Sequence, residues 1–119
     1  MKVVIVDDAD MVRNMIKSLL AELPDVQIVG EAGHVHGAIE MVRTIQPDVV
    51  ILDIKLPDGS GLDVLHELKQ KRPVPLVIMM TSFPSLELRT VCLKAGAGLF
   101  LDKSTELYEL PEMLRTLMP

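Results

Sequence analysis

Aromatic residues and cysteines are scarce in this chain of 119 residues. Aromatic side chains make up 3% of the sequence and tryptophan is absent, so Val, Ile, Leu and Met must fill the core of a protein that is 49% hydrophobic. The single cysteine, Cys92, excludes an internal disulfide and fits a reducing compartment. Because Cys92 lies on an apolar stripe of a predicted helix, we expect it in the core.

Long apolar segments and extended basic runs are also missing. No stretch approaches the length of a membrane span, and the first residues, MKVVIVDDAD, turn acidic too early for a signal peptide. The formal net charge of −5 gives no general attraction to nucleic acid or to an anionic membrane. The short basic stretch KQKR, at 69–72, looks like the end of a helix. We therefore expect a soluble cytoplasmic protein that binds neither nucleic acid nor membrane through this segment.

The sequence does contain five short apolar runs that are rich in β-branched residues. Runs of this kind are typical of parallel strands buried on both faces of a sheet. In the segments that follow them, apolar residues recur at three- and four-residue steps with a polar complement, which predicts helices lying on that sheet. The runs are KVVIV (2–6), VQIVGEA (26–32), DVVILD (48–53), PLVIMM (75–80) and GLFL (98–101).

This alternation of strands and helices predicts a single α/β domain over residues 1–119, a doubly wound parallel sheet of five strands with right-handed crossovers. One common order for five strands is 2-1-3-4-5, the flavodoxin-like (βα)5 arrangement, which makes strands 1 and 3 neighbours.

Several residues indicate where the helices begin and end. Pro24, with the aspartate after it, is expected to stop the first helix, and Gly96 to end the fourth. Ser60 is placed to cap the third helix, whose last turn is expected to carry the basic residues at 69, 71 and 72. Pro111 fits only in the first turn of the fifth helix, so residues 104–109 are expected to form a loop or turn.

Charged and hydroxyl side chains occur at the ends of four of the five predicted strands. In open α/β sheets, ligands bind outside the carboxyl ends of the strands, where the strand order reverses. Neighbouring strands 1 and 3 would therefore bring three carboxylates together. The residues are Asp7 and Asp8 after the first run, Asp53 at the end of the third, Thr81 and Ser82 after the fourth, and Asp102 and Lys103 after the fifth.

Three crowded carboxylates repel one another, and a divalent cation or an ammonium group relieves that repulsion. Mg²⁺ suits such oxygen ligands and often bridges to phosphate. Lys103 can supply the ammonium group, and Thr81 or Ser82 a hydroxyl donor. Together these groups describe a phosphoryl-transfer site with Asp53 as its nucleophile. For any one residue the simpler interpretation is a helix cap or a solvated side chain, but four strands with suitable groups at one edge favour the site.

The same residues resemble a known family, the response-regulator receiver domain of two-component signalling, in the CheY-like superfamily. An acidic pair follows the first strand in VDDAD, and LDIKLPDGSG is similar to the LDxxLPxxxG segment after the third. A Thr ends the fourth strand in IMMTS, and KAGA leads to an aromatic residue and a Lys in KAGAGLFLDKS. The resemblance covers the whole chain, with the motifs in order and at the family's spacing.

The resemblance implies a role for each matching position. Asp53 is similar to the phosphoacceptor. Asp8, Asp53 and the backbone carbonyl of Lys55 match the direct Mg²⁺ ligands, while Asp7 would act through a bound water. Lys103 would pair with the acceptor carboxylate and then with the phosphoryl group.

Further positions match the switch and the control of hydrolysis. Thr81 would move toward the phosphoryl oxygen, and Phe100 matches the aromatic residue that swings inward with it. Lys55 and Phe83 are expected to flank the approach of water to the phosphoryl group and to slow its hydrolysis. The family's Lys is usually followed by a proline, often through a cis bond, but here Ser104 follows, and we expect a trans peptide bond because a non-proline cis bond costs roughly 2.5–4 kcal/mol.

The histidines and two methionines have simpler explanations. His34 and His36 form an H-x-H in the loop predicted after the second strand, where no other metal ligands are expected. His66 is expected on the surface of the third helix. Met113 and Met118 on the fifth helix are expected to fill gaps, with contact to a partner as the alternative.

The resemblance implies a phosphorylation-activated response regulator rather than an enzyme, limited to self-catalysed phosphotransfer and slow autodephosphorylation. The phosphoryl group would come from a sensor histidine kinase or a phosphotransfer protein. The face formed by helix 4, strand 5 and helix 5 would then signal to an output protein that the sequence does not identify. A dimer that forms on phosphorylation is left open. A stand-alone regulator is favoured, although a receiver domain taken from a longer DNA-binding regulator would look identical.

Three other classes of protein are alternatives to a response regulator. A haloacid-dehalogenase-type phosphatase also uses Asp, Mg²⁺ and Lys, but its nucleophile would follow strand 1 in a DxD arrangement, whereas Asp7 and Asp8 are adjacent. A constitutive scaffold would keep the residues without the switch. A nucleotide-binding flavodoxin-like protein is disfavoured because no glycine-rich phosphate loop follows the first strand.

Overall fold

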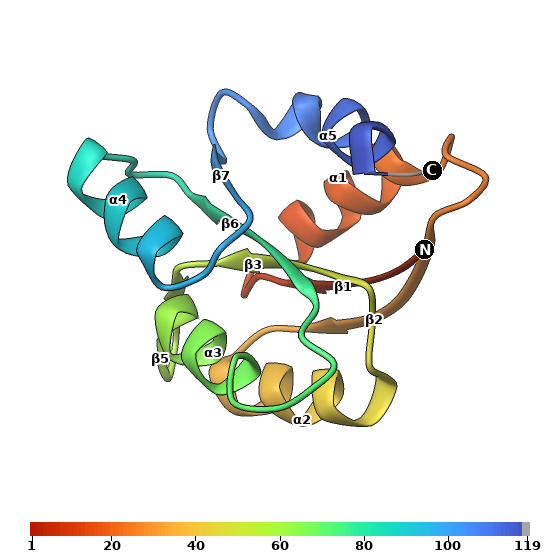
Figure 1. Cartoon of the computed structure of the whole chain (residues 1–119). Coiled ribbons are helices and arrows are strands. Elements are labelled where there is room, and N and C mark those ends of the chain that lie inside the picture. Colours follow the sequence, from red (N-terminus) through yellow and green to blue (C-terminus); the bar gives the residue numbers. More distant parts are fainter. Residues whose placement is uncertain (118–119) are drawn as a thin grey trace.

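The computed structural model describes residues 1–117 and places a five-stranded parallel sheet at the centre of the molecule (Figure 1). Its strand order, β2-β1-β3-β6-β7, is the predicted 2-1-3-4-5 order, and every pair of neighbouring strands is parallel. The predicted doubly wound fold is therefore confirmed. The strands are β1 (Lys2–Val6), β2 (Gln27–Ala32), β3 (Val49–Asp53), β6 (Leu76–Thr81) and β7 (Leu99–Asp102).

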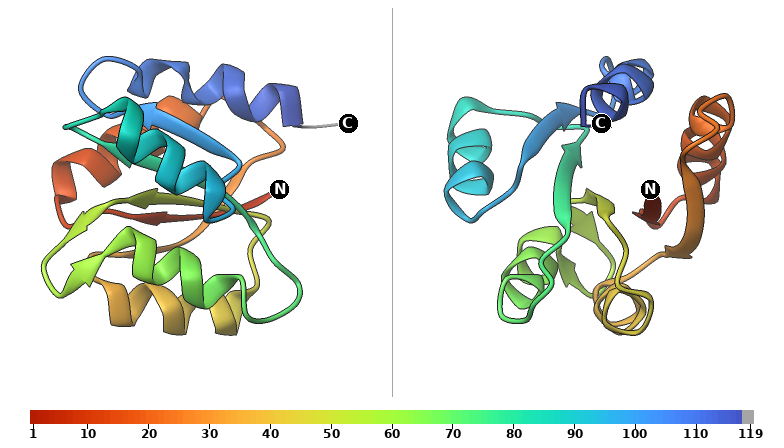
Figure 2. Two further views of the ribbon diagram at one scale, coloured as in Figure 1. Left: turned by 60° about the vertical axis from the view of Figure 1, so that its left-hand side comes forward. Right: turned by 45° about the vertical axis from the view of Figure 1, so that its right-hand side comes forward.

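Helices cover both faces of the sheet (Figure 2). α1 and α5 pack on one face, and α2, α3 and α4 pack on the other. No helix within residues 1–117 is both long enough and apolar enough to cross a membrane. The helices are α1 (Asp10–Leu20), α2 (Val35–Ile45), α3 (Gly61–Leu68), α4 (Leu86–Lys94) and α5 (Leu110–Leu117), with a 3₁₀ turn η1 (Leu107–Glu109) before α5.

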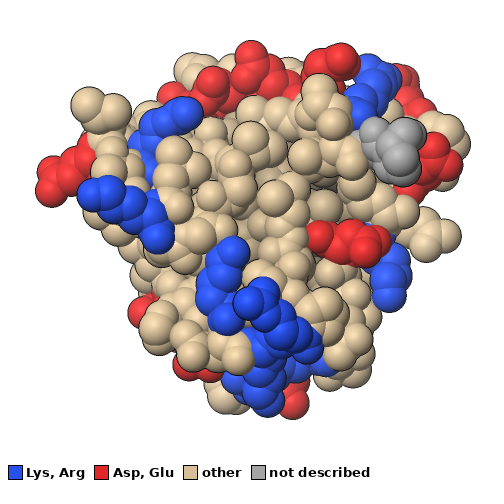
Figure 3. All heavy atoms as spheres, in the orientation of Figure 1, with Lys and Arg blue, Asp and Glu red and all other residues tan. Residues whose placement is uncertain are grey.

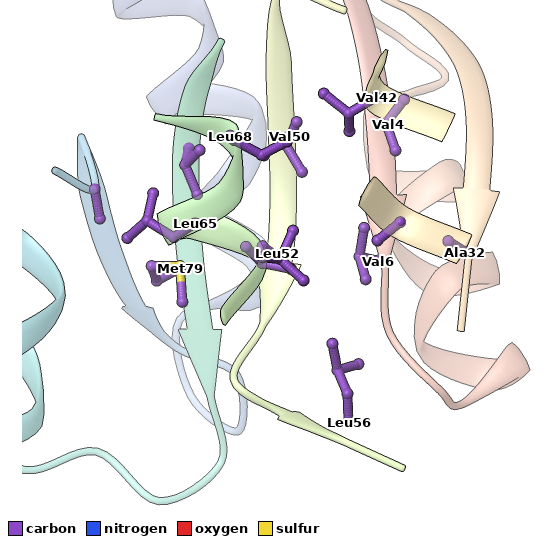
Figure 4. Packing of buried hydrophobic residues seen from close by; sticks show 14 of the residues in the cluster. Val4, Val6, Ala32, Val42, Val50, Leu52, Leu56, Leu65, Leu68 and Met79 are labelled. Carbon is purple, nitrogen blue, oxygen red and sulfur yellow. The ribbon is translucent and has the colours of Figure 1, made fainter. Parts of the chain in front are cut away.

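The central apolar runs form strands with both faces buried, whereas the edge strand β2 is only partly buried before Ala32. Along β3, Val50 and Leu52 point into the core under α2 and α3, while Val49 and Ile51 point into the core under α1 and α5. Figure 4 shows the first of these cores, in which side chains from the strands meet those of α2 and α3. Each such side chain contributes roughly 1.5–3 kcal/mol when fully buried, so a strand with two buried faces needs no polar alternation. Cys92 is fully buried in the first core, as predicted.

Most of the predicted helix boundaries are confirmed. Ser60 caps α3 by accepting a hydrogen bond from the Leu62 amide (3.0 Å), and Asp63 completes a capping box. α4 ends just before Gly96, whose φ of +108° lies in a region that side chains strongly disfavour. Pro111 lies in the first turn of α5, after the turn structure expected over 104–109.

Two helices end earlier than predicted. α3 ends at Leu68, so the basic residues at 69, 71 and 72 lie beyond its last turn and not within it. After Leu68 the chain tightens into a turn in which the Gln70 amide donates to the Glu67 carbonyl (3.1 Å). Pro73 further disfavours the helical conformation at Arg72. α1 ends at Leu20 rather than at Pro24, because the chain turns there and the Leu23 amide donates to the Leu20 carbonyl (3.1 Å), with Leu23 buried in the core.

A short hairpin after β3 was not predicted. β4 (Lys55–Leu56) and β5 (Gly59–Ser60) pair in antiparallel fashion on either side of a turn at 57–58. In that turn the Asp58 carboxylate accepts hydrogen bonds from the amides of Val35 (2.7 Å) and His36 (3.2 Å), at the start of α2. Asp58 thus fixes the segment that carries Lys55 to a helix more than twenty residues earlier in the chain.

The histidines and the methionines of α5 also have defined places. His34 is the N-cap of α2, and its Nδ1 accepts a hydrogen bond from the Gly37 amide (3.0 Å). His36 lies within α2 and not in the loop before it, because that helix begins at Val35. His66 is exposed on α3, as predicted. Met113 is partly buried against the core, whereas Met118 lies outside the described residues.

Asp58→Ala should lower the melting temperature at pH 7. The hydrogen bonds from Val35 and then His36 hold the pKa of Asp58 below its ordinary value. A lowered pKa means that the carboxylate stabilises the fold above the pKa of the unfolded chain, and that this contribution is lost as the pH falls. The difference from wild type should therefore shrink below about pH 4. Thermal melts across this pH range test the prediction, with Asp25→Ala at another exposed aspartate as the control; equal effects of the two substitutions would contradict it.

Candidate functional site

The predicted charged residues meet at the carboxyl edge of the sheet. β1 and β3 pair with Val6 opposite Leu52, so the next residue of each strand, Asp7 and Asp53, face each other at the strand ends. β6 and β7 extend one residue further than predicted, which makes Thr81 and Asp102 their last residues and pairs them in register. Strand pairing alone thus delivers these groups to one edge of the sheet.

Lys103 joins the two buried carboxylates. Its Nζ lies 2.8 Å from Asp7 Oδ2 and 2.9 Å from Asp53 Oδ2. Asp7 is fully buried and Asp53 is 4% exposed. The other oxygen of Asp7 accepts a hydrogen bond from the Ala9 amide (2.8 Å), so Asp7 has protein partners on both of its oxygens. The lysine ammonium therefore lies between two buried carboxylates that would otherwise repel each other at this edge of the sheet.

Asp53 is the carboxylate with the most altered protonation. Its pKa is raised to about 6: burial is the main cause, the hydrogen bond from Lys103 opposes it, and the nearby charge of Asp7 adds to the rise. For Lys103, burial lowers the pKa, but the hydrogen bonds to Asp7 and Asp53 outweigh burial and leave the pKa above its ordinary value. Lys103 is therefore a permanent cation here, while Asp53 gains from any further positive charge placed beside it.

Asp8 completes a group of three carboxylates. One carboxylate oxygen from each of Asp7, Asp8 and Asp53 lies within 4.8 Å of the others, which confirms that the three converge. Asp8 is exposed, in contrast to its two buried partners. Carboxylate oxygens around an open, solvent-facing point are the donors that suit Mg²⁺, which keeps several waters and takes only a few protein ligands. The donor set therefore fits that ion.

A hollow of about 370 Å³ lies over these carboxylates. Thr81 is 5% exposed, and its Oγ1 accepts a hydrogen bond from the Phe83 amide (3.1 Å), which leaves the hydroxyl proton available as a donor. Lys55 and Phe83 are largely exposed, and both border the hollow. The hollow is lined by Asp8, Asp53, Lys55, Leu56, Pro57, Thr81, Ser82, Phe83 and Lys103.

The loop after Lys103 is closed without a proline. The peptide bond between Lys103 and Ser104 is trans, as predicted. Asp102 Oδ1 accepts hydrogen bonds from the Ser104 amide (2.9 Å) and hydroxyl (2.6 Å), so this side chain holds the turn. The Lys103 amide donates to the Thr81 carbonyl (2.8 Å), which fixes the start of the lysine to the neighbouring strand. Phe100, the second residue of β7, is 9% exposed and packs in the core under α2, α3 and α4.

Sequence reasoning missed a second group of charges behind the site. Arg13 of α1 donates to the backbone carbonyl of Asp7 and, through Nε, to Glu31 Oε1 of β2 (3.1 Å). Lys17 holds the other oxygen of Glu31 at 2.8 Å, and its hydrogen bond, with that of Arg13, lowers the pKa of Glu31. Glu31 is the next-to-last residue of β2, so its position at a strand end was a usable signal. Arg13 anchors the backbone between the two acids of the pair.

Gly61 has a steric role beside Asp53. A Cβ at this position would overlap the carbonyl oxygen of Asp53 and would lie 3.0 Å from its carbonyl carbon. Because the obstacle is backbone, it cannot turn aside as a flexible side chain could. The start of α3 can therefore approach the end of β3 only with glycine at position 61. The Gly61 amide donates a hydrogen bond to the Ile54 carbonyl (2.7 Å), which stabilises this close contact.

Comparison with known proteins identifies the class of domain that this fold and site define. The family model of the response regulator receiver domain matches residues 3–115. Among curated proteins, the chain is 35% identical over 114 residues to the DNA-binding transcriptional activator DevR/DosR of Mycobacterium tuberculosis, covering 96% of this chain and 52% of that protein. It is 33% identical to a protein-glutamate methylesterase/protein-glutamine glutaminase of Nitrosomonas europaea, covering 96% of this chain and 35% of that protein.

Solved structures show the same likeness. The receiver domain of the response regulator NarL from Mycobacterium tuberculosis superposes with a TM-score of 0.89 at 25% identity, covering 98% of this chain and 94% of that one. The response regulator domain of Thermotoga maritima CheB gives 0.86 at 27% identity, with the same coverage. The chain belongs to the response regulator receiver domain family. It spans about half the length, or less, of the curated relatives named above.

Asp53→Asn should stabilise the metal-free protein at neutral pH. The raised pKa of Asp53 means that between about pH 4 and pH 6 the folded protein holds a proton that the unfolded chain has released, so stability falls as the pH rises through this range. Removing the charge should raise the free energy of unfolding by about 1 to 3 kcal/mol at pH 7.5, and by close to nothing near pH 4. Urea unfolding in EDTA buffers at several pH values measures this, with Glu87→Gln on exposed α4 as the control. A gain that does not depend on pH, or a loss of stability, would show that burial of the charge is not the cause.

Proposed function

We propose that this receiver domain, over residues 1–119, accepts a phosphoryl group on Asp53. The observation that carries the proposal is the position of Lys103 Nζ, 2.8 Å from Asp7 and 2.9 Å from Asp53, with Asp8 completing the acidic group. A partly buried lysine and acids that border an open hollow are the parts that phosphoryl transfer needs: a carboxylate nucleophile and positive charge for the phosphoryl oxygens. Membership of the receiver family supports this function over the phosphatase alternative.

The transfer itself is a substitution at phosphorus. An oxygen of the Asp53 carboxylate forms a bond to phosphorus as the bond from phosphorus to the donor's histidine nitrogen breaks, and the imidazole leaves with the electron pair of that bond. Asp53 must be ionised to attack, which its pKa of about 6 allows at neutral pH. Lys103 can keep one bond to Asp7 and turn its charge to the phosphoryl oxygens. Thr81, with a free hydroxyl proton, can donate to another of those oxygens.

Mg²⁺ would be held by Asp8, Asp53 and the backbone carbonyl of Lys55, with Asp7 acting through water. When bound, the ion offsets the charge of the carboxylates and of the phosphoryl oxygens. The residues of the chain prepare that place: Arg13 fixes the Asp7 carbonyl, and Asp58 fixes the hairpin that carries Lys55. Each of these two contacts ties a loop of the site to a helix.

The signal would follow from a shift of Thr81 toward the phosphoryl group. Thr81 now accepts from the Phe83 amide, so its movement would pull on the segment that leads into α4. Phe100 lies on the neighbouring strand, and it would take up the space that Thr81 leaves. The surface formed by α4, β7 and α5 would then change for an output partner, with a sensor histidine kinase or phosphotransfer protein as the cytoplasmic donor. The domain performs no further catalysis than its own phosphorylation and slow dephosphorylation, and it can stand alone or form part of a longer DNA-binding regulator.

Wild-type protein incubated with acetyl phosphate and Mg²⁺ should gain one phosphoryl group without any kinase. Asp53→Asn should gain none, because the nucleophile is gone. Asp25→Asn, the same change at an exposed aspartate before the amino end of β2, should still be modified, and EDTA should abolish modification of every variant. Intact-mass spectrometry reads the result directly. Modification of Asp53→Asn to the wild-type extent would remove the proposed acceptor.

Lys55→Asn and Phe83→Glu should each speed the loss of phosphate. Both side chains border the hollow over Asp53, and neither can orient an attacking water as an amide or carboxylate can. One hydrogen bond to that water, at about 0.5–1.5 kcal/mol, corresponds to a rate increase of roughly twofold to tenfold. Decay of the phosphorylated protein is followed by mass spectrometry after the donor is removed.

Matched controls for this test lie on exposed residues away from the hollow. Lys94→Asn on α4 and Tyr108→Glu in η1 make the same chemical changes and should decay at the wild-type rate. If Lys55→Asn and Phe83→Glu also decay at that rate, or more slowly, these two residues do not control hydrolysis.

A further inference from the structure

A second hollow lies at the opposite end of the sheet from Asp53. It opens between the last turns of α2 and α3 and the segment that leads into β6. This end of the sheet is the one at which the strands begin. Its volume is about 230 Å³, smaller than the roughly 300–1,000 Å³ of pockets that take drug-sized ligands. It is lined by Val42, Arg43, Gln46, Glu67, Leu68, Lys71, Arg72, Pro73 and Pro75.

The hollow carries an excess of positive charge. Arg43, Lys71 and Arg72 line it together with one acid, Glu67, which gives a local excess of two positive charges on a chain whose net charge is −5. Glu67 is engaged by Arg43 at 3.0 Å. Within residues 1–117, neither Lys71 nor Arg72 makes an ion pair. Figure 3 shows Lys and Arg side chains gathered on the part of the surface where Figure 1 places α2, α3 and the chain that follows α3.

The backbone around these cations is restrained. Lys71 and Arg72 stand directly before Pro73, and Pro75 follows two residues later, so two proline rings limit the freedom of the segment that presents them. Gln46 ends α2 in the left-handed conformation (φ 55°), which turns the chain away at the rim of the hollow. Val42 and Leu68, both 5% exposed, supply apolar surface below. The hollow therefore combines cations on a restrained backbone with apolar walls.

We propose that this hollow binds a small organic phosphate. Lys71 and Arg72 would hold the phosphate oxygens, since guanidinium and ammonium groups make the strongest hydrogen bonds to phosphate. The apolar body of the ligand would lie against Pro73 and Leu68. A hollow of this volume has room for one phosphate and a ring. The groove that continues from it past Arg43 and Glu67 is lined by the further acids Glu40 and Asp63, which disfavour a nucleic acid strand or an acidic peptide that would have to run along it. The site is separate from the phosphoacceptor and stands whether or not Asp53 is phosphorylated.

Titration of ¹⁵N-labelled protein with phenyl phosphate and with inorganic phosphate tests this site by NMR. The buffer is free of Mg²⁺ and its ionic strength is held constant, because screening would otherwise change with each addition. Phenyl phosphate should produce saturable shifts of the amides of Gln46, Lys71 and Arg72, and should bind more tightly than inorganic phosphate. The double variant Lys71→Gln/Arg72→Gln should bind about tenfold or more weakly, which matches the loss of one or two charge-assisted hydrogen bonds.

The control pair Arg89→Gln/Lys94→Gln removes the same charges from the exposed surface of α4 and should leave the affinity unchanged. Asp53→Asn should also bind as wild type does, which separates this site from the phosphoacceptor. Shifts that grow without saturation, that are equal in the two double variants, or that centre on Lys103 would overturn the proposal. So would phenyl phosphate that binds no more tightly than inorganic phosphate, or an acidic peptide or oligonucleotide that binds there without competition from phenyl phosphate.

Discussion

The contact of Lys103 with Asp7 and Asp53 is the interaction on which the rest of the site depends. Two carboxylates buried side by side would be strongly unfavourable without a cation between them. Lys103 meets this need at 2.8 and 2.9 Å, and in the proposed function the same ammonium would turn to the phosphoryl group. The pKa of Asp53 stays raised at about 6, mainly because of burial, although Lys103 is in place.

The scaffold holds the two mutually repelling carboxylates of Asp7 and Asp53 in a defined geometry. Parallel pairing of β1 with β3 sets Asp7 opposite Asp53, and the absence of a side chain at Gly61 lets α3 start directly against the Asp53 carbonyl. Around this centre, Arg13 and Asp58 each hold a loop by hydrogen bonds to the backbone. The acids can therefore stay close because strands, helix starts and loops all restrain them, and not because they attract one another.

The two ends of the sheet carry different groups of charges. Three carboxylates converge at the carboxyl ends of the strands, and an excess of cations lines the hollow at the amino ends, around Lys71 and Arg72. Net charge alone, at −5, describes neither end. A chain that is acidic on average can thus present one edge to cations and the other to anions, and its partners are better inferred from each edge than from the total.

The sequence by itself determined the fold and the edge of the sheet at which the candidate site lies. Unbroken β-branched runs are typical of strands with two buried faces, and parallel strands bring their carboxyl ends, with Asp53 and Lys103, to one edge. Local signals such as Ser60 and Gly96 also act within a few residues, so they were readable. Pro73 is a local signal of the same kind, since it disfavours a helix that continues to Arg72.

Only the tertiary structure decided the contacts between residues that lie far apart in the chain. The Arg13–Glu31 pair, the bond from the Val35 amide to Asp58 across 23 residues, and the hollow that joins the ends of α2 and α3 have no local pattern. Their formation depends on how helices settle on the sheet. Periodicity fixes which face of a helix is buried, but it does not fix which polar side chains meet at its ends, because those distances are set by packing.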